Sequence, residues 1–233
     1  MAIGMRRLLT LGARTDAAEL LDSGRLSRSE VEANLADLAR LNRLPGGTDA
    51  SVRAIERLVG NGNDVRILDV GTGAGDMPIA FAKRGWRVLA ADVNPDVLAV
   101  AEAALARVPG VDVGEADVLA LPLDDGAVDV AHCSLLIHHL APEEAVMALA
   151  ELRRVARHGV VVNDLRRGFM PLAATWVSVL ALGRSRVTRA DGVVSARRAY
   201  TLSELDALLA EAGLTPRWRS TGWLPRVVTA ATA

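Results

Sequence analysis

The stretch that decides the fold is Leu68-Asp-Val-Gly-Thr-Gly-Ala-Gly-Asp76. An apolar run ends near Asp69 and passes directly into glycines at alternate positions, a pattern typical of a strand that turns tightly into a helix. Glycines at such a turn let the backbone approach a ligand, which meets the N–H groups at the start of the helix. The sequence therefore predicts an α/β sheet with a ligand-binding loop after its first strand.

The charges beside this loop indicate which ligand it takes. Asp69 and Asp76 flank the glycines. Two carboxylates would repel the pyrophosphate of a dinucleotide, whereas S-adenosylmethionine (SAM) carries an ammonium and a sulfonium and no phosphate. The acidic loop therefore favours SAM, and an NAD-type site stays as the first alternative.

The remainder of the chain repeats a strand-and-helix rhythm from residue 65 onward, as parallel sheets with crossover helices do. Strands are predicted at residues 65–70, 88–92, 111–116, 128–134 and 160–163, and helices at 77–84, 95–107, 142–156 and 201–213. Two terminal runs, 215–220 and 224–229, predict an antiparallel pair. The expected fold is α/β: a Rossmann-like, seven-stranded, mostly parallel sheet with an antiparallel C-terminal strand pair and helices on both faces.

Two parts of the chain lie outside this rhythm. Residues 1–62 are expected to form helices that precede the sheet, with Ser27 or Ser29 as an N-cap, and residues 63–233 to form the ligand-binding domain. An insertion is expected at about 165–200, where the apolar segment 169–182 predicts either a lid over the ligand crevice or a core helix. This segment is too short to span a bilayer, and Met1 to Thr10 is too short for a signal peptide.

Composition excludes several classes of protein. The 27 Lys and Arg residues balance 28 Asp and Glu residues, so no overall field attracts nucleic acid or an anionic membrane. The single cysteine, Cys133, excludes an internal disulfide and is compatible with a reducing compartment. We therefore expect a cytoplasmic protein without a membrane anchor.

Acidic residues recur at the ends of the next two predicted strands. Asp92 lies roughly 20 residues beyond the loop, where a carboxylate can accept both ribose hydroxyls, a feature that NAD and SAM share. Asp117 can accept from the exocyclic amine of adenine, and the backbone N–H of Val118 can serve a ring nitrogen.

With these motifs, residues 65–164 resemble the class I SAM-dependent methyltransferases, in particular those that methylate small molecules such as quinones, polyketides and sugars. The matching segments are 68–76, 91–95, 114–123, 128–140 and 148–155. The resemblance implies contacts to the methionine end from Asp69 and the loop, to the ribose from Asp92, to adenine from Asp117 and Val118, and to the sulfonium side after Ser134. The implied cofactor residues are Asp69, Gly71, Thr72, Gly73, Gly75, Asp76, Asp92, Val93, Asp117, Val118 and Ser134.

Two histidines that follow the fourth strand are the candidates for catalysis. Methyl transfer occurs at a carbon that the sulfonium already activates, so positioning supplies much of the rate. If the acceptor is a hydroxyl, His138 or His139 can remove its proton, and Asp164 can orient a histidine or act itself. The alternatives are that the histidines pack the loop or order the methionine end, and that Asp164 caps a loop.

Other polar residues are assigned no chemistry. His132 is expected to be hydrogen-bonded inside its strand, and His158 to lie at a helix end. No histidine or cysteine pair has a metal-binding spacing, and no carboxylate partner is evident, so no metal is predicted.

An arginine-rich tract occupies the insertion and its approach. Its members are Arg166, Arg167, Arg184, Arg186, Arg189, Arg197 and Arg198. Such a tract can bind an anionic substrate or an RNA backbone, or simply form a solvated surface. Aromatic residues are scarce at 3%, and residues 134–137 lack the Asn/Asp-Pro-Pro-aromatic motif of enzymes that methylate base amines. A nucleic-acid partner is therefore not expected.

The sequence thus predicts a SAM-dependent methyltransferase that acts on a small molecule, with a hydroxyl of an aromatic, polyketide-like or isoprenoid compound as the expected acceptor. An NAD-type Rossmann oxidoreductase and a non-catalytic SAM-binding module are the alternatives.

Overall fold

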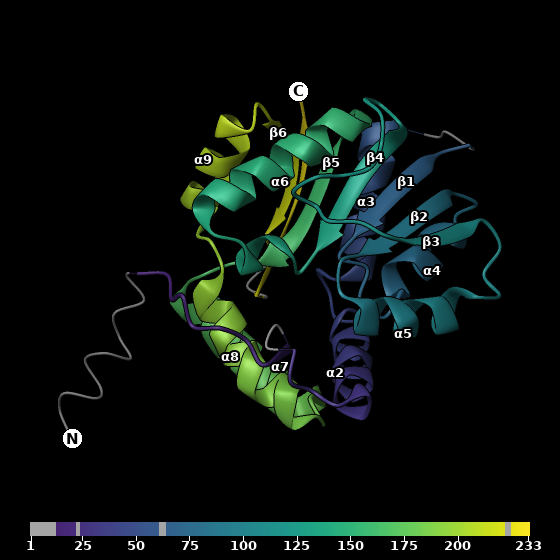
Figure 1. Cartoon of the computed structure of the whole chain (residues 1–233). Coiled ribbons are helices and arrows are strands. Elements are labelled where there is room, and N and C mark those ends of the chain that lie inside the picture. Colours follow the sequence, from purple (N-terminus) through teal and green to yellow (C-terminus); the bar gives the residue numbers. More distant parts are fainter. Residues whose placement is uncertain (1–12, 22–23, 61–63, 222–224) are drawn as a thin grey trace, which may run out of the picture.

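A computed structural model describes residues 13–21, 24–60, 64–221 and 225–233 and shows one seven-stranded sheet in the order β3-β2-β1-β4-β5-β7-β6 (Figure 1). The strands are β1 (Arg66–Val70), β2 (Arg87–Asp92), β3 (Val111–Glu115), β4 (Val128–Ser134), β5 (Ala156–Leu165), β6 (Thr215–Thr221) and β7 (Arg226–Thr232). Strands β1 to β5 are parallel, and β7 runs antiparallel between β5 and β6. This topology confirms the predicted fold.

Helices cover both faces of the sheet. The helices are α2 (Arg28–Leu41), α3 (Thr48–Val59), α4 (Asp76–Ala82), α5 (Pro95–Leu105), α6 (Pro142–Val155), α7 (Phe169–Leu182), α8 (Arg186–Arg198) and α9 (Leu202–Glu211), with a 3-10 turn η2 (Ile137–His139). Neighbouring residues of β5 point to opposite faces, so Val160 and Val162 pack with α6 and α9, whereas Val161 packs with α3 and α4. The buried valines therefore serve two helical layers at once.

Helix α3 belongs to the core, which differs from the expectation that both N-terminal helices only precede the sheet. Ala54 and Ile55 are fully buried and pack with Ile67, Val130 and Val161 from three strands of the sheet. The reason is the apolar face of α3, which covers the side of β4, β5 and β7 opposite to the crossover helix α6. The segment Met1 to Thr10 and residues 61–63 lie outside the described part of the chain.

The insertion forms a helical hairpin of α7 and α8 that lies with α2 beside the carboxyl ends of the parallel strands (Figure 1). Helix α8 was not predicted, because residues 186–198 appear in the sequence as part of an arginine-rich tract. This helix forms because the Ser185 hydroxyl accepts from the Val187 N–H at 3.1 Å, and because Val187 and Ala196 are buried while Arg186 and Arg197 stay exposed. None of the described helices has the length and apolar character needed to cross a membrane.

A buried carboxylate on α2 fixes the start of α8. Asp37 is fully buried, and its Oδ2 accepts from the backbone N–H groups of Arg184 and Ser185, each at 2.7 Å. These N–H groups precede the first turn of α8, where helical partners are missing. Asp37 therefore attaches α2 to the hairpin.

The variant Asp37→Ala is expected to lower the free energy of unfolding by about 1–3 kcal/mol, because two part-buried N–H donors lose their acceptor. Urea denaturation monitored by circular dichroism measures the change. Glu32→Ala, which breaks the exposed Arg28–Glu32 ion pair on the same helix, is the matched control and should cost about 0.5 kcal/mol or less. Equal losses for the two variants would contradict the anchoring role of Asp37.

Candidate active site

A cavity of about 530 Å³ lies at the carboxyl edge of the sheet. Its floor is the glycine loop and the ends of β2 and β4, and its walls come from α2, α7 and α8. Ligands of open α/β sheets bind at this edge, and the volume is that of an ordinary small-molecule site. The fold therefore places the predicted loop in the right location for a cofactor.

Most of the predicted cofactor residues line this cavity, as do both candidate histidines. Those that line it are Gly71, Thr72, Gly73, Asp76, Asp92, Val93, Asp117, Val118, Ser134, His138 and His139. Asp69, Gly75 and Asp164 lie behind this lining. The structure therefore brings the predicted residues together at the ends of five strands. Three of these residues, Asp69, Gly75 and Asp164, do not line the cavity and so cannot contact a ligand directly.

The glycine loop forms a cradle that side chains would fill. Gly71 and Gly73 have φ values of 69° and 56°, in the left-handed region that glycine adopts without strain. A Cβ atom on Gly71 would lie 3.2 Å from the Leu136 side chain, tighter than an ordinary contact. The Thr72 N–H is bonded to the Ala91 carbonyl at 3.0 Å, which fixes the loop against β2.

Asp69 holds the loop from beneath. Its Oδ2 accepts from the Thr72 hydroxyl at 2.8 Å, and its Oδ1 lies 2.6 Å from Nδ1 of His132. His132 Nε2 in turn lies 2.9 Å from the Ser51 hydroxyl on α3. Both oxygens of Asp69 thus have partners within the protein, which differs from the expected direct contact to a methionine group. The expectation that His132 is a hydrogen-bonded core residue is confirmed.

Asp92 and Asp117 occupy the positions expected for the ribose and adenine ends. Asp92 Oδ1 accepts from the Asn94 N–H at 3.0 Å, and Oδ2 faces the Gly73 N–H at 3.4 Å. Burial raises the pKa of Asp92, and these backbone N–H groups only partly offset that effect. Asp117 is exposed at the cavity mouth and accepts from the Leu119 N–H at 2.9 Å.

The turn after β4 is strained where it meets the cavity. Leu135 has φ of 54°, which side chains rarely adopt, and it is held there by a bond of 2.9 Å from its N–H to the Asn163 carbonyl. Strain of this kind persists where the surroundings fix a functional geometry. Here it directs η2, with its two histidines, toward the cavity.

His138 and Asp164 form a buried pair. Asp164 Oδ1 lies 2.6 Å from Nδ1 of His138, and Oδ2 accepts from the His138 backbone N–H at 3.0 Å. Burial by itself raises the pKa of Asp164, but the charge and hydrogen bonds of His138, with the Leu165 N–H, outweigh it and leave the pKa below its ordinary value. Asp164 therefore orients His138, and its carboxylate lies behind the ring rather than in the cavity.

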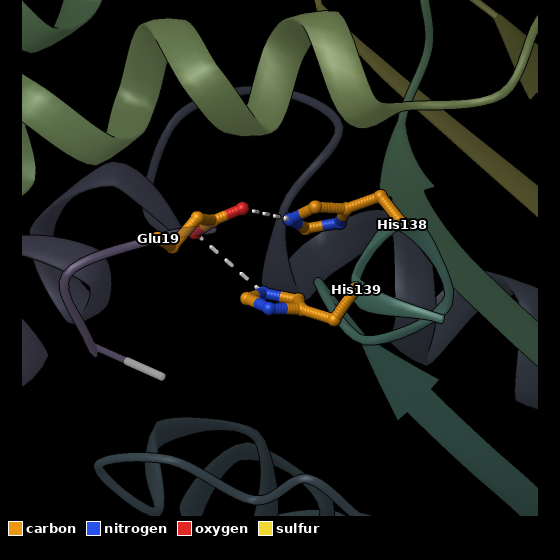
Figure 2. Close-up of side chains that lie close together, drawn as sticks. All are labelled: Glu19, His138 and His139. Atoms are coloured by element: carbon orange, nitrogen blue, oxygen red, sulfur yellow. Dashed lines mark ion pairs between the residues drawn. The ribbon is translucent and has the colours of Figure 1, made fainter. Parts of the chain in front are cut away.

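A further carboxylate, that of Glu19, faces both histidines and was not predicted from the sequence (Figure 2). Glu19 Oε1 lies 3.7 Å from Nε2 of His138, and Oε2 lies 3.8 Å from Nε2 of His139. These three residues are a group whose atoms could together hold a metal ion. The guanidinium of Arg198, 4.0 Å from Glu19 Oε1, already provides this carboxylate with a cation. Glu19 could not be found from spacing, because 119 positions separate it from His138.

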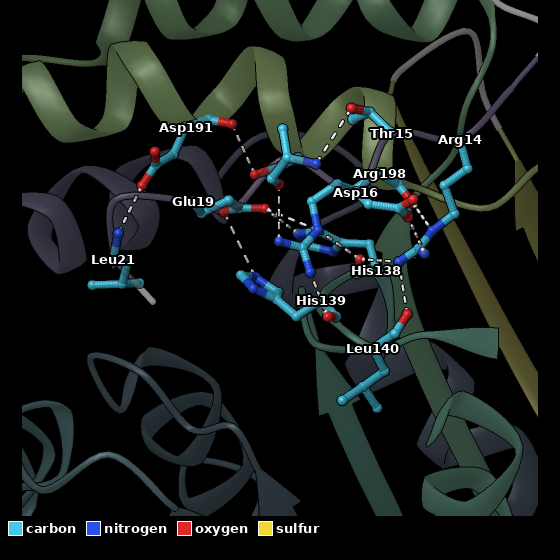
Figure 3. Close-up of polar contacts among 12 residues, drawn as sticks. Arg14, Thr15, Asp16, Glu19, Leu21, His138, His139, Leu140, Asp191 and Arg198 are labelled. Atoms are coloured by element: carbon cyan, nitrogen blue, oxygen red, sulfur yellow. Dashed lines mark hydrogen bonds and ion pairs between the residues drawn. The ribbon is translucent and has the colours of Figure 1, made fainter. Parts of the chain in front are cut away.

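The segment that carries Glu19 is tied across α8 and η2 (Figure 3). Arg14 donates to the carbonyls of His138 at 2.8 Å and Leu140 at 2.6 Å. Asp191 on α8 accepts from the N–H groups of Leu20 and Leu21 at 2.8 and 3.1 Å. We call residues 14–21 the N-terminal strap; it covers the histidine side of the cavity.

Arg226, the first residue of β7, is a second site residue that the sequence analysis missed. It is buried and lines the cavity, and it donates to the Asn42 side-chain oxygen, to Asn163 Oδ1 at 3.3 Å and to the Ser134 hydroxyl at 3.4 Å. Burial lowers its pKa to about 10, while the charges of Asp164 and Asp76 act in the opposite direction. The sequence feature that could have indicated Arg226 is a single arginine at the start of an otherwise mostly apolar terminal strand.

The arginines of the insertion do not present a common binding face. Arg167 pairs with Glu204 at 2.7 Å, Arg186 with Glu30 at 2.9 Å, and Arg189 donates to the Gly183 carbonyl at 3.0 Å. Arg198 donates to the carbonyls of η2. These guanidinium groups hold the hairpin to its neighbours, which differs both from a binding tract and from the solvated surface that was the alternative.

The sheet order is that of the Rossmann-like fold that solved methyltransferase structures share. Residues 67–159 match the family described as "Methyltransferase domain". This part of the chain is therefore similar to the methyltransferase domain family.

Several proteins that are similar to this chain carry methyltransferase names. A demethylmenaquinone methyltransferase of Thermus thermophilus is 41% identical over 40% of this chain and 43% of its own length. One from a Parafrankia species is 29% identical over 77% of this chain and 78% of its own. A SAM-dependent methyltransferase from Aquifex aeolicus shares the fold, with a TM-score of 0.64, 20% identity and coverage of 89% and 98%. The chain spans about two fifths of the length of several curated relatives that it matches.

The His138–Asp164 pair generates a prediction about stability and pH. Because the pKa of Asp164 is lowered in the folded state, its carboxylate stabilises the fold above its ordinary pKa of about 3.9, and this contribution is lost as the pH falls toward the lower folded value. At pH 7, Asp164→Asn should lower the free energy of unfolding by about 3–5 kcal/mol. Denaturant unfolding from pH 7 to 3 should show a constant difference between the two proteins above about pH 5, narrowing below about pH 4. A difference that does not change with pH would contradict a charged Asp164.

Proposed function

We propose that the protein transfers the methyl group of SAM to a small-molecule acceptor, and that the acceptor atom is a hydroxyl oxygen. The observation that supports this most is a single cavity that joins the acidic glycine loop and Asp92 on one side to a carboxylate-backed histidine on the other. A cofactor bound at the loop would share this cavity with an acceptor placed beneath η2. The family of the domain supports the same cofactor.

The residues present fit SAM. The backbone of the loop leaves space at Gly71 that a Cβ atom would narrow. Asp92 offers a buried carboxylate for the ribose, and Asp117 and Val118 line the part of the cavity proposed for adenine. Asp76 and Asp92 place negative charge around the site, which suits a cationic ligand and opposes a pyrophosphate. When bound, SAM supplies a methyl carbon activated by a sulfonium. This charge pattern favours SAM over the NAD alternative.

The acceptor half of the cavity is mostly apolar. It is lined from α2 and the following turn by Leu38, Leu41, Leu44 and Pro45, together with Asn34 and Asn42. Val179 of α7 faces it, whereas Trp176 of the same helix is exposed. We propose that this wall takes an aromatic, polyketide-like or isoprenoid acceptor. The quinone-directed names of two relatives support a flat lipophilic ligand.

His138 is proposed to accept the proton of the acceptor hydroxyl. Its Nδ1 side is fixed by Asp164, so Nε2 is the nitrogen that faces the cavity and Glu19. His139 lies beside it, with ring centroids 4.3 Å apart, and is proposed to orient the acceptor or share the proton. Arg198 balances the charge of Glu19, so we propose that no metal is required. Because Arg167, Arg186 and Arg189 are bound within the protein, we also propose that nucleic acid is not the acceptor.

The proposal is tested by isothermal titration of the protein with S-adenosylhomocysteine (SAH) and with NADH, followed by assays of SAH release with phenolic, quinol and polyketide hydroxyl compounds. We expect that SAH binds, that NADH does not bind, and that SAH is released in an acceptor-dependent reaction. NADH binding in place of SAH would instead indicate an oxidoreductase. SAH binding without turnover on any acceptor would indicate a non-catalytic module.

Asp92→Ala is expected to weaken SAH binding by roughly 10- to 100-fold, because a buried acceptor of two ribose hydroxyls is lost. Titration calorimetry measures the affinity. Asp112→Ala removes an exposed carboxylate from the neighbouring β3 and should leave the affinity unchanged. An unchanged affinity in Asp92→Ala would rule out the ribose contact.

Replacing both His138 and His139 by Ala is expected to lower turnover of a hydroxyl acceptor by roughly 10²- to 10⁴-fold, because the proton acceptor is removed. SAH affinity, measured in parallel, separates chemistry from cofactor binding. His158→Ala, an exposed histidine far from the cavity, is the control. Turnover of the double variant close to the wild-type rate would exclude a base in this pair.

A further inference from the structure

Helix α7 presents an apolar face at the surface of the protein. Its 14 residues include no charged side chain, whereas the outward face of an ordinary surface helix is polar. In the described part of the chain eight large apolar side chains are exposed, and five of them lie on α7. These five have exposed fractions between 51% and 64%, and they are Phe169, Met170, Trp176, Val177 and Leu180. A concentration of this kind marks a surface that binds an apolar partner.

The exposed side chains of α7 form one stripe along the helix. Counted from Phe169, the other four lie one, seven, eight and eleven residues further on, which is the spacing of a single helical face. Ala173 and Ala181, at steps four and twelve, are exposed on the same face. The opposite face is occupied, because Thr175 and Val179 are buried and line the cavity. We call the seven exposed residues the α7 stripe.

The α7 stripe is too small to hold two copies of the chain together. A helix of 14 residues is about 21 Å long and about 10 Å wide, so one face of it offers roughly 200 Å². A specific protein interface buries about 800 Å² on each partner. A lipid surface has no such minimum, because binding to it grows with each apolar side chain that is buried. The area therefore favours a lipid surface over a second copy.

The residue types of the stripe and its flank suit the boundary of an anionic bilayer. Tryptophan is enriched at that boundary, and tryptophan, phenylalanine and leucine form the apolar face of helices that lie in it. Residues 166–198 hold seven arginines and one aspartate, although the charge of the whole chain is balanced. Several of these guanidinium groups are bound within the protein. Arg184 is exposed two residues after α7, where a long cationic side chain can reach lipid headgroups.

We propose that the α7 stripe binds the surface of an anionic lipid bilayer, with its side chains buried at the boundary of headgroups and acyl chains and Arg184 at the headgroups. The helix then separates the bilayer from the cavity by its own diameter of about 10 Å. A lipophilic acceptor dissolved in the bilayer would therefore lie close to the half of the cavity proposed for it. This link with the acceptor rests on the proposed function, whereas the lipid contact itself requires no cofactor.

The test is co-sedimentation of the protein with vesicles of equal parts phosphatidylcholine and phosphatidylglycerol, without SAM or acceptor. The wild-type protein is expected to sediment with the vesicles. Replacing both Trp176 and Val177 by Gln is expected to lower the partition coefficient by about 10- to 100-fold, because the centre of the stripe becomes polar. Neither side chain lines the cavity, so SAH affinity should not change. Met147→Gln, at a similarly exposed apolar residue of α6, is the matched control and should bind vesicles as the wild type does.

Two further variants separate the apolar from the electrostatic contribution. Replacing both Phe169 and Met170 by Gln alters the other end of the stripe, and it should lower binding in the same way if the first double variant does not fold. Arg184→Gln is expected to lower affinity for the anionic vesicles by about fivefold and to leave affinity for pure phosphatidylcholine unchanged. An equal effect of Arg184→Gln on both kinds of vesicle would contradict a contact between this arginine and anionic headgroups.

Each other outcome contradicts the proposal in a distinguishable way. A wild-type protein that stays in the supernatant at every lipid concentration would overturn it, and equal binding by the wild type and the double variants would exclude the stripe as the contact. Dimers in analytical ultracentrifugation that the double variants do not form, without vesicle binding, would assign the stripe to a second copy. Vesicle binding by a protein that binds no SAH would support the lipid contact and overturn the proposed function instead.

Discussion

The site depends on the hydrogen bonds of the buried Asp69 carboxylate. It joins three elements: Thr72 in the glycine loop, His132 in β4 and, through that ring, Ser51 in α3. A low-polarity interior makes such a chain of hydrogen bonds stiff, and it makes an unpaired member expensive. The loop is therefore held in its left-handed conformation by contacts that leave its upper surface free. An acidic residue at this position acts as a support of the cradle.

The sequence was sufficient for the fold and for most of the cofactor side. Apolar periodicity and glycine placement are local signals, and they predicted all seven strands and the residues from Gly71 to Val118 that line the cavity. Prediction failed where a role depends on a distant partner. Glu19 and Arg226 reach the site from opposite ends of the described chain. Spacing along the sequence cannot show that two such distant residues lie close together in the fold. The exception was Asp164, whose pairing with a histidine followed from the common edge of parallel strands.

Two halves of the cavity have opposite character. Around the loop the protein offers carboxylates, one buried guanidinium and backbone N–H groups, whereas α2, the turn after it and α7 offer mainly leucine, valine and proline, with Asn34, Thr175 and Ser178 among them. Hydrogen bonds fix direction and apolar walls tolerate variation, so the polar half is suited to one ligand and the apolar half to a range of shapes. The histidines of η2 lie at the boundary, where chemistry between the two ligands would occur. Such a division lets the acceptor change while the cofactor site stays the same.

The N-terminal strap has a kinetic consequence. Arg14, the backbone at Leu20 and Leu21, and the Glu19 carboxylate attach it to α8 and η2 through many separate polar contacts. A molecule that leaves on this side has to wait until those contacts break together, and collective openings of this kind occur in microseconds to milliseconds. Departure of the methylated product on the strap side is then timed by the opening of a peptide segment, so the residence time of the product becomes a property of residues 14–21 as well as of the acceptor.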